Sequence, residues 1–243
     1  MKCVIAFKWA KNPQDARVSA DGAVDWRAAK MVASDDDAAA VVVARDLAVG
    51  DELVGLTVGD GDVAWAAARG ATRTVSVADV EPNADCAVLG EVLAAGVRRI
   101  GGADIVIIGD GVWDQMVSMS LAGQLGWAVV AGVVSATTEG DRLHVTRKSG
   151  TGTEVIEVGT PVVLAVAARR AEDKPPGMKD VLAARKKPLE KVAMADLGVT
   201  SVGGVTLRGT ALPEAADARI FDGADPEGAV EQLMTALRSE GVL

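Results

Sequence analysis

The stretch LVGLTVGDGDVAWAAARGATRTVSVA, residues 53–78, decides the predicted fold. It opens with an apolar strand at Leu53–Val58, continues with a helical segment at Asp62–Arg69 and closes with a second strand at Thr74–Ala78. Apolar runs that alternate with helices are typical of a parallel sheet covered on both faces. We therefore predict an α/β fold with a doubly wound, mainly parallel sheet.

The same alternation continues on both sides of this stretch. A strand at Lys2–Lys8, a small hairpin at Val18–Val24 with a turn at Asp21-Gly22, and a helix that starts after Ser34 and ends near Gly50 precede it. After it we predict helix Ala87–Arg99, strand Ile105–Gly109, helix Gln115–Leu125 and strands Val129–Val134, Leu143–Thr146, Val155–Val158 and Val162–Val166. Short Gly-containing turns between the last four strands indicate antiparallel additions to the sheet.

Residues 169–191 form a basic segment within an acidic chain. The whole chain carries a formal charge of −9, whereas this segment has eight Lys or Arg and four Asp or Glu, which gives +4. This local reversal favours an electrostatic docking surface, although a solvated face without a partner has the same composition. We expect one domain over residues 1–190, including a loop over 169–188, and a C-terminal arm over 191–243 with a helix at Pro226–Arg238.

Composition and missing motifs exclude several classes of function. The negative charge argues against a nucleic-acid partner, and no apolar run is long enough for membrane insertion. Two cysteines and one histidine cannot form a closed zinc site, and so few cysteines fit a reduced, cytoplasmic protein. The P-loop, GxGxxG and GxSxG motifs are absent, and His144 is predicted to be a half-exposed strand residue. We therefore assign no catalytic residue and no metal ligand.

The loops that follow Lys8, Val58 and Gly109 form the candidate ligand site. Open parallel sheets bind ligands at the carboxyl ends of their strands, where the strand order switches. Glycines at 109 and 111 would let backbone N–H groups approach a phosphate. Trp113 in the same loop either stacks on a base or flavin or packs in the core or at its rim.

An acidic cluster, Asp35, Asp36 and Asp37, follows Ser34 at the start of the first long helix. A serine can cap the free N–H groups of a helix, and carboxylates stabilise the positive end of its dipole. A magnesium site is the alternative, since hard cations prefer carboxylates. Consecutive helical residues point in different directions, so capping is the favoured interpretation.

The order of these segments resembles the beta (small) subunit of electron-transfer flavoproteins over most of residues 1–200. The matching pieces are VIAFK (4–8), SDDDAAAVVVARDL (34–47), LTVGDGD (56–62), ARGATR (68–73), ADIVIIGDG with the following DQ (103–115), VLAARKKPLEKV (181–192) and ADLGV (195–199). The resemblance implies an adenine-nucleotide-binding, Rossmann-like sheet and an electron carrier without catalytic residues of its own. It also implies a heterodimer with an alpha subunit, which carries the redox-active FAD, and AMP or a second FAD on this chain.

The resemblance implies a set of cofactor-binding residues by position. They are Ala6, Ser34, Asp35, Asp36, Asp37, Val58, Gly109, Asp110, Gly111, Val112, Trp113, Asp114, Gln115 and Met116. The loop at 109–116 is shorter than is usual in the family. Met116 has no hydroxyl for a phosphate, and Asp110 brings a like charge, which disfavours one.

The family's recognition loop, which docks a flavin-dependent dehydrogenase through an apolar anchor, corresponds to residues 169–188. By position the anchor falls on Met178, with Val181 and Leu182 beside it. An apolar side chain inside a charged rim has the usual anatomy of a binding hot spot. The alternative for the whole chain is a free-standing nucleotide-binding regulatory module of the same fold, a stress-protein-like dimer.

Overall fold

The computed structural model consists of two compact units. It describes residues 1–59, 61–81, 83–111, 113–114, 116–140, 142–167, 175–200, 204–205, 208–214 and 218–243. The larger unit comprises Met1–Arg17 and Val24–Gly209, and the smaller comprises Val18–Ala23 and Thr210–Leu243. Because each unit has its own set of internal contacts, each is described by itself.

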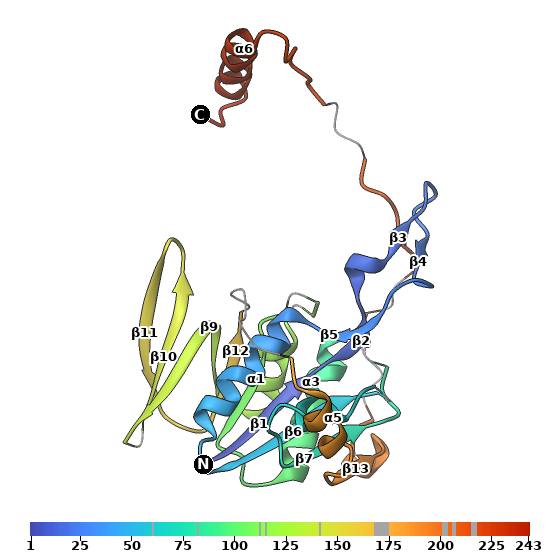
Figure 1. Cartoon of the computed structure of the whole chain (residues 1–243), viewed down its shortest axis with the longest axis vertical. Helices are drawn as coiled ribbons and strands as arrows, with labels where there is room; N and C mark the ends of the chain where they lie inside the picture. Colours follow the sequence, from blue (N-terminus) through green and yellow to red (C-terminus); the bar gives the residue numbers. More distant parts are fainter. Residues whose placement is uncertain are drawn as a thin grey trace. The chain divides into compact units, whose positions relative to one another are not determined.

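A nine-stranded sheet forms the centre of the larger unit (Figure 1). Its order is β11-β10-β9-β12-β8-β1-β6-β7-β13. The parallel part contains β1 (Lys2–Phe7), β6 (Glu52–Val58), β7 (Arg73–Val77), β8 (Ile105–Gly109), β12 (Val162–Val166) and β13 (Leu189–Val192). This arrangement confirms the predicted α/β fold with a mainly parallel sheet.

An antiparallel extension widens the sheet beyond β12, as the Gly-containing turns predict. It consists of β9 (Ala128–Glu139), β10 (Arg142–Ser149) and β11 (Gly152–Val158). β9 pairs in parallel with β12 and antiparallel with β10, so it joins the two parts of the sheet. His144 lies on β10 with 33% of its side chain exposed, 3.2 Å from Glu139. The prediction of a half-exposed strand histidine is confirmed.

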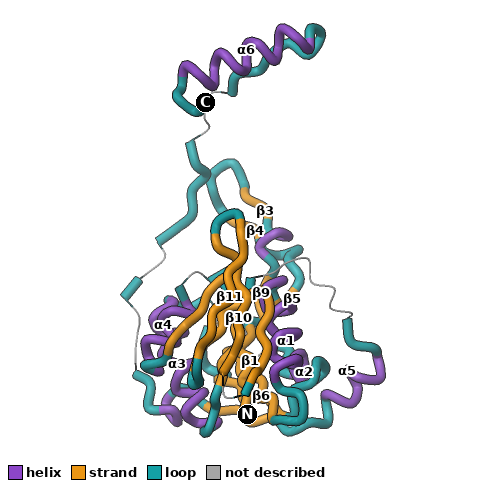
Figure 2. Tube along the Cα trace, turned by 90° about the vertical axis from the view of Figure 1, so that its left-hand side faces the viewer, coloured by secondary structure: helices purple, strands orange, loops and turns teal. Residues whose placement is uncertain are grey.

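Helices cover both faces of the sheet (Figure 2). One face carries α3 (Cys86–Ile100) and α4 (Val117–Leu125), and the other carries α1 (Asp35–Leu47), α2 (Ala64–Ala67) and α5 (Met178–Ala184). Each face has its own apolar core. The side chains of β1 alternate between the two, with Val4 and Ala6 in one core and Cys3 and Ile5 in the other. This double burial explains the continuous apolar runs of the strands.

Several shorter elements complete the larger unit. β2 (Trp9–Lys11) and β5 (Met31–Ala33) form a two-stranded antiparallel sheet. The others are the 3₁₀ turns η1 (Pro13–Asp15) and η2 (Ala195–Leu197) and the short strand β4 (Val24–Asp25). The short strand β3 (Arg17–Val18) has its first residue in the larger unit and its second in the smaller. The expected arm from residue 191 begins later, because β13 pairs with β7 through Val192 and keeps the chain on the sheet. The larger unit therefore continues to Gly209.

The smaller unit contains one helix, α6 (Pro226–Ser239), among its described residues. Asp225 caps the helix through the backbone N–H of Gly228, and none of its residues is buried. Thr210 donates a hydrogen bond to the carbonyl of Gly22 at 2.7 Å, and the predicted turn at Asp21-Gly22 is present. In the chain as described, we find no helix with the length and apolar character that a bilayer span requires.

Candidate functional site

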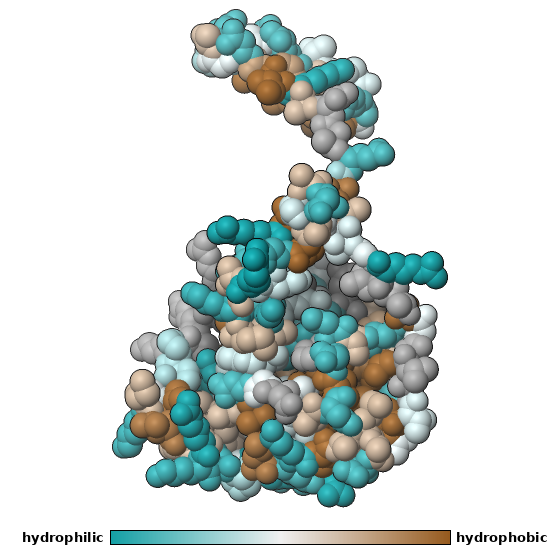
Figure 3. All heavy atoms as spheres, turned by 90° about the vertical axis from the view of Figure 1, so that its right-hand side faces the viewer, coloured by the Kyte–Doolittle hydropathy of each residue, from teal (hydrophilic) through white to brown (hydrophobic). Residues whose placement is uncertain are grey.

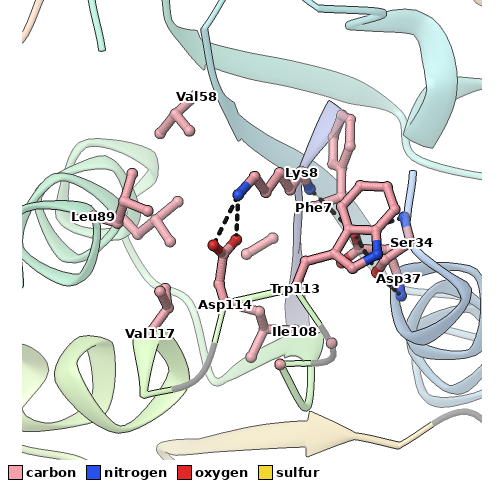
Figure 4. A pocket seen from close by; sticks show the side chains of 14 residues that line it. Phe7, Lys8, Ser34, Asp37, Val58, Leu89, Ile108, Trp113, Asp114 and Val117 are labelled. Carbon is pink, nitrogen blue, oxygen red and sulfur yellow. Dashed lines mark hydrogen bonds and ion pairs between the residues drawn. The ribbon is translucent and has the colours of Figure 1, made fainter. Parts of the chain in front are cut away.

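The carboxyl ends of β1, β6 and β8 meet at one pocket. β1 lies between the other two strands, and Ala6 pairs with Leu56 on one side and Ile108 on the other. Ala6, Val58 and Gly109, the three strand ends expected to converge, all line this pocket. The other lining residues come from β1 and β8, from the flanking loops and from α1, α3 and α4. They are Phe7, Lys8, Ser34, Asp37, Leu89, Leu93, Ile108, Gly111, Trp113, Asp114 and Val117 (Figure 4).

The pocket is narrow and mainly apolar at its walls. Its volume is about 50 Å³, which is room for a few water molecules. Leu89 of α3 and Val117 of α4 form one wall, and Trp113 lies on the other side (Figure 4). Trp113 is half-buried and lines the pocket, as either interpretation of this side chain requires.

The start of α1 forms a capped, buried corner of the pocket. The hydroxyl of Ser34 accepts a hydrogen bond from the backbone N–H of Asp37 at 3.0 Å, and the Asp37 carboxylate accepts from the Ser34 hydroxyl at 2.9 Å. The same carboxylate oxygen accepts from the backbone N–H of Lys8 at 3.3 Å. Burial raises the pKa of Asp37 to about 6, although these hydrogen bonds favour its charged form. The predicted capping role of this segment is confirmed.

The three aspartates at the start of α1 do not converge. Asp35 is exposed, whereas Asp36 and Asp37 are buried, and only Asp37 lines the pocket. Within the described ranges, no group of three or more Asp, Glu, His or Cys could hold a metal ion. The arrangement agrees with the expectation that neighbouring helical carboxylates point in different directions.

Lys8 and Asp114 form an ion pair in the middle of the pocket. The Lys8 ammonium lies 2.7 Å from one carboxylate oxygen of Asp114 and 2.8 Å from the other. Only 13% of the Lys8 side chain and 26% of the Asp114 side chain are exposed. Figure 4 shows the pair next to Val58, Leu89 and Val117. The ion pair therefore fills space between the strand ends and the helices.

The loop after β8 uses its glycine differently from the sequence prediction. A Cβ atom on Gly109 would lie 2.9 Å from Cβ of Asp36 and 3.2 Å from the backbone nitrogen of Asp37. Gly109 therefore lets the first turn of α1 approach the end of β8. This contact gives the glycine a packing role that needs no phosphate.

Two further residues of this loop turn away from the pocket. Asp110 accepts a hydrogen bond from the backbone N–H of Gly132 at 3.1 Å, and burial raises its pKa. Met116 adopts a left-handed conformation with a φ of 74° and is 62% exposed. Neither lines the pocket. Val112 and Gln115, also predicted for the site, lie outside the described residues.

Residues 23–197 match the family described as "Electron transfer flavoprotein domain". The matched range contains every strand of the nine-stranded sheet except β1, together with α1 and α3, which bound the pocket. The chain belongs to the electron transfer flavoprotein family. β1 with Ala6 and the adjoining Lys8 precede the matched range, so the pocket joins residues from inside and outside it. Members of this family bind flavin and carry electrons.

The pocket is small for the adenine nucleotide that the family resemblance implies. Its apolar walls suit a flat ring, but its volume of about 50 Å³ is well below that of usual small-molecule sites, which measure about 300–1,000 Å³. In the middle of the pocket, the ammonium of Lys8 is held by the carboxylate of Asp114. Both oxygens of this carboxylate lie within 2.8 Å of the ammonium nitrogen, so the cation is already paired. Binding of a nucleotide requires the walls to move.

The predicted partner anchor lies on an exposed helix. Met178 is 76% exposed and Leu182 is 53% exposed, and Val181 between them is half-buried. Their spacing along α5 places all three on one face. Lys187 donates to the carbonyls of Ala67 and Ala71 at 2.9 and 2.8 Å, which fixes the segment after α5 to α2. Residues 169–174 of the predicted loop lie outside the described residues.

Sequence reasoning missed several pocket residues. Phe7 and Lys8 immediately follow Ala6, and their position at a strand end was a usable signal. Leu89 and Leu93 lie one turn apart on α3, and no local pattern separates them from ordinary core residues. Val117 lies next to Met116 at the start of α4, and it lines the pocket although no part of the sequence reasoning selected it.

Proposed function

We propose that this chain is the small, beta-type subunit of a heterodimeric electron transfer flavoprotein. The family domain occurs in both subunits, so the choice of subunit is an inference of ours. In this role the chain passes electrons between a flavin-dependent dehydrogenase and an acceptor, with the redox-active FAD mainly on the alpha subunit. The chain positions cofactors and docks partners, and it supplies no acid, base or nucleophile.

The observation that carries this proposal is the convergence of Ala6, Val58 and Gly109 on one pocket in the family domain. Ligands of open parallel sheets bind at this edge, where β1 is flanked by strands that the chain reaches in opposite directions. We propose that the adenosine part of AMP or of a second FAD occupies this pocket after its walls separate. Ser34, Val58, Gly109 and Trp113 would contact it.

The smaller unit supports a heterodimer. α6 has apolar residues at 230, 233 and 237, which fall on one helical face, and Val230 and Leu233 are 58% and 43% exposed. Figure 3 shows apolar side chains grouped on this helix. An isolated helix of this length is marginally stable in water, so burial of the apolar face on a partner subunit would stabilise it.

Co-expression with the large subunit tests the assignment. We expect the two chains to copurify as a yellow heterodimer, and extraction should give one FAD and one AMP per complex. Two FAD per complex would instead indicate the bifurcating type of electron transfer flavoprotein. A stable homodimer that does not bind the large subunit would contradict the proposal and favour a free-standing regulatory module.

A matched pair of variants sharpens this test. Leu233→Asp places a charge on the apolar face of α6 and should lower recovery of the heterodimer by about tenfold or more. Gln232→Asp places the same charge at the preceding position, on the polar side of the helix, and should leave recovery of the heterodimer unchanged. Equal recovery of both variants would show that α6 does not contact the large subunit.

A further inference from the structure

The polar groups of the pocket are held by carboxylates of the chain itself. Asp37 accepts hydrogen bonds from the Ser34 hydroxyl and the Lys8 backbone, and Asp114 binds the Lys8 ammonium. These are the kinds of donor that an anionic ligand would otherwise use. The pocket therefore already contains the anions that satisfy its donors.

Lys8 is the single cation among the described residues that line the pocket. It projects from the end of β1, between the strand ends and α3, where a phosphate attached to a bound ring would be attracted. Both oxygens of Asp114 lie within 2.8 Å of its ammonium nitrogen. The carboxylate thus occupies the position that two phosphate oxygens would take on Lys8.

We infer that Asp114 is a built-in competitor that sets how strongly the pocket discriminates between phosphorylated and unphosphorylated ligands. This inference rests on the proposed nucleotide site. A phosphate reaches Lys8 only after Asp114 has left it, and it then meets the negative charge of the displaced carboxylate. A neutral ligand such as adenosine must also open the pocket but meets no such repulsion. Asp114 therefore lowers affinity for AMP more than affinity for adenosine.

The surrounding loop makes Asp114 replaceable without loss of the fold. Asp110 holds the start of the loop to Gly132 of β9, and Gly109 packs under α1. The backbone N–H of Lys8 remains bound to Asp37 whatever its side chain contacts. Removing the charge of Asp114 should therefore change the ligand preference and leave these contacts in place.

Calorimetric titration of the full chain, freed of bound nucleotide, tests the inference with AMP and adenosine as separate probes. In the wild type we expect AMP to bind no more tightly than adenosine. Asp114→Asn should raise the affinity for AMP by about tenfold or more, and by more than it raises the affinity for adenosine. The melting temperature of each variant reports that it is folded.

The control removes an equal charge from an ion pair at the other end of the sheet. Glu52 begins β6 and binds Arg73 and Lys2 at 3.1 and 3.2 Å. Glu52→Gln should leave both affinities unchanged. In an Asp114→Asn background, Lys8→Gln should abolish the gain for AMP, because the ammonium that binds the phosphate is lost.

The outcomes separate this inference from the proposed nucleotide site. If the wild type prefers AMP over adenosine by more than about tenfold, or if Asp114→Asn leaves that preference unchanged, Asp114 does not compete and the inference is wrong, although the site stands. If no variant binds either compound, the nucleotide site itself is wrong, and the inference falls with it. The wild-type comparison remains decisive should Asp114→Asn fail to fold.

Discussion

The pocket at the strand ends and the exposed face of α5 differ in how far their side chains are buried and paired. In the pocket, apolar walls face one another and Lys8 is paired with Asp114. On α5, Met178 and Leu182 expose most of their surface. A closed pocket must give up internal contacts before it binds anything, whereas an exposed apolar face loses only water. The α5 face is therefore accessible without any rearrangement, whereas the pocket opens only when its internal contacts break.

The largest expected effect comes from a substitution on the exposed face of α5. Met178→Asp replaces the most exposed apolar side chain of α5 with a charge. We expect reduction by the dehydrogenase to fall by about thirtyfold or more, the size of a hot-spot loss, while bound flavin is retained. Stopped-flow reduction of the heterodimer measures the rate, and its absorbance reports the flavin.

Val155→Asp is the matched control for this experiment. Val155 lies on the edge strand β11 and is 66% exposed, close to the 76% of Met178. It should leave the reduction rate unchanged, since nothing assigns β11 to the docking surface. If both variants reduced normally, the docking anchor would have to lie elsewhere.

A substitution at Gly109, beside the pocket at the strand ends, gives the next largest effect. Gly109→Ala would place a methyl group 2.9 Å from Cβ of Asp36, so the start of α1 must shift. We expect the free energy of unfolding to fall by about 1–3 kcal/mol, as overpacking does. A Cβ atom on Gly123, which lies in α4, would meet no atom within 4 Å. Gly123→Ala should therefore raise the stability slightly, by up to about 1 kcal/mol.

Burial of Asp37 predicts that the stability of the fold depends on pH. Its pKa of about 6 exceeds the ordinary 3.8, so the folded chain binds this proton more tightly than the unfolded chain does. The contribution of Asp37 to stability therefore increases as the pH falls through 6 and levels off below 3.8. Urea unfolding of Asp37→Asn should lack this increase, which we expect to be about 1–3 kcal/mol.

An Asp→Asn substitution in α5 provides the comparison. Asp180 holds the third position of α5 and caps the backbone N–H of Gly177 at 3.2 Å, as Asp37 caps Ser34 in α1. Asp180 is exposed. Asp180→Asn therefore measures the effect of losing a capping carboxylate from an exposed helix start. Parallel pH profiles for the wild type and Asp37→Asn would rule out a raised pKa at Asp37.

Local sequence signals predicted most of the sheet and the capped helix. Strands such as Leu53–Val58 and Ile105–Gly109 are buried on both faces, so their apolar runs stand out. Ser34 and Asp37 carry a capping box whose chemistry is visible in the sequence. The helix predicted at Asp62–Arg69 is shorter, at Ala64–Ala67, because the chain turns at Gly70 with a φ of 118° to enter β7.

The missed features depend on contacts between distant residues or on a weak local pattern. Lys8 and Asp114 are 106 positions apart, and no periodicity in the sequence relates the end of β1 to the loop that follows β8. α5 was predicted as part of a loop because its surroundings are rich in Lys, Arg and Pro. Its apolar residues at 178, 181 and 182 already had helical spacing, but seven residues give a short pattern.

Lys8 serves two structures through different atoms. Its backbone N–H binds Asp37 at the start of α1, and its ammonium binds Asp114. Because any residue except proline supplies that N–H, the side chain at position 8 can change without loss of the helix contact. The charge inside the pocket at the strand ends can therefore change through a single substitution, at little cost to the architecture that surrounds it.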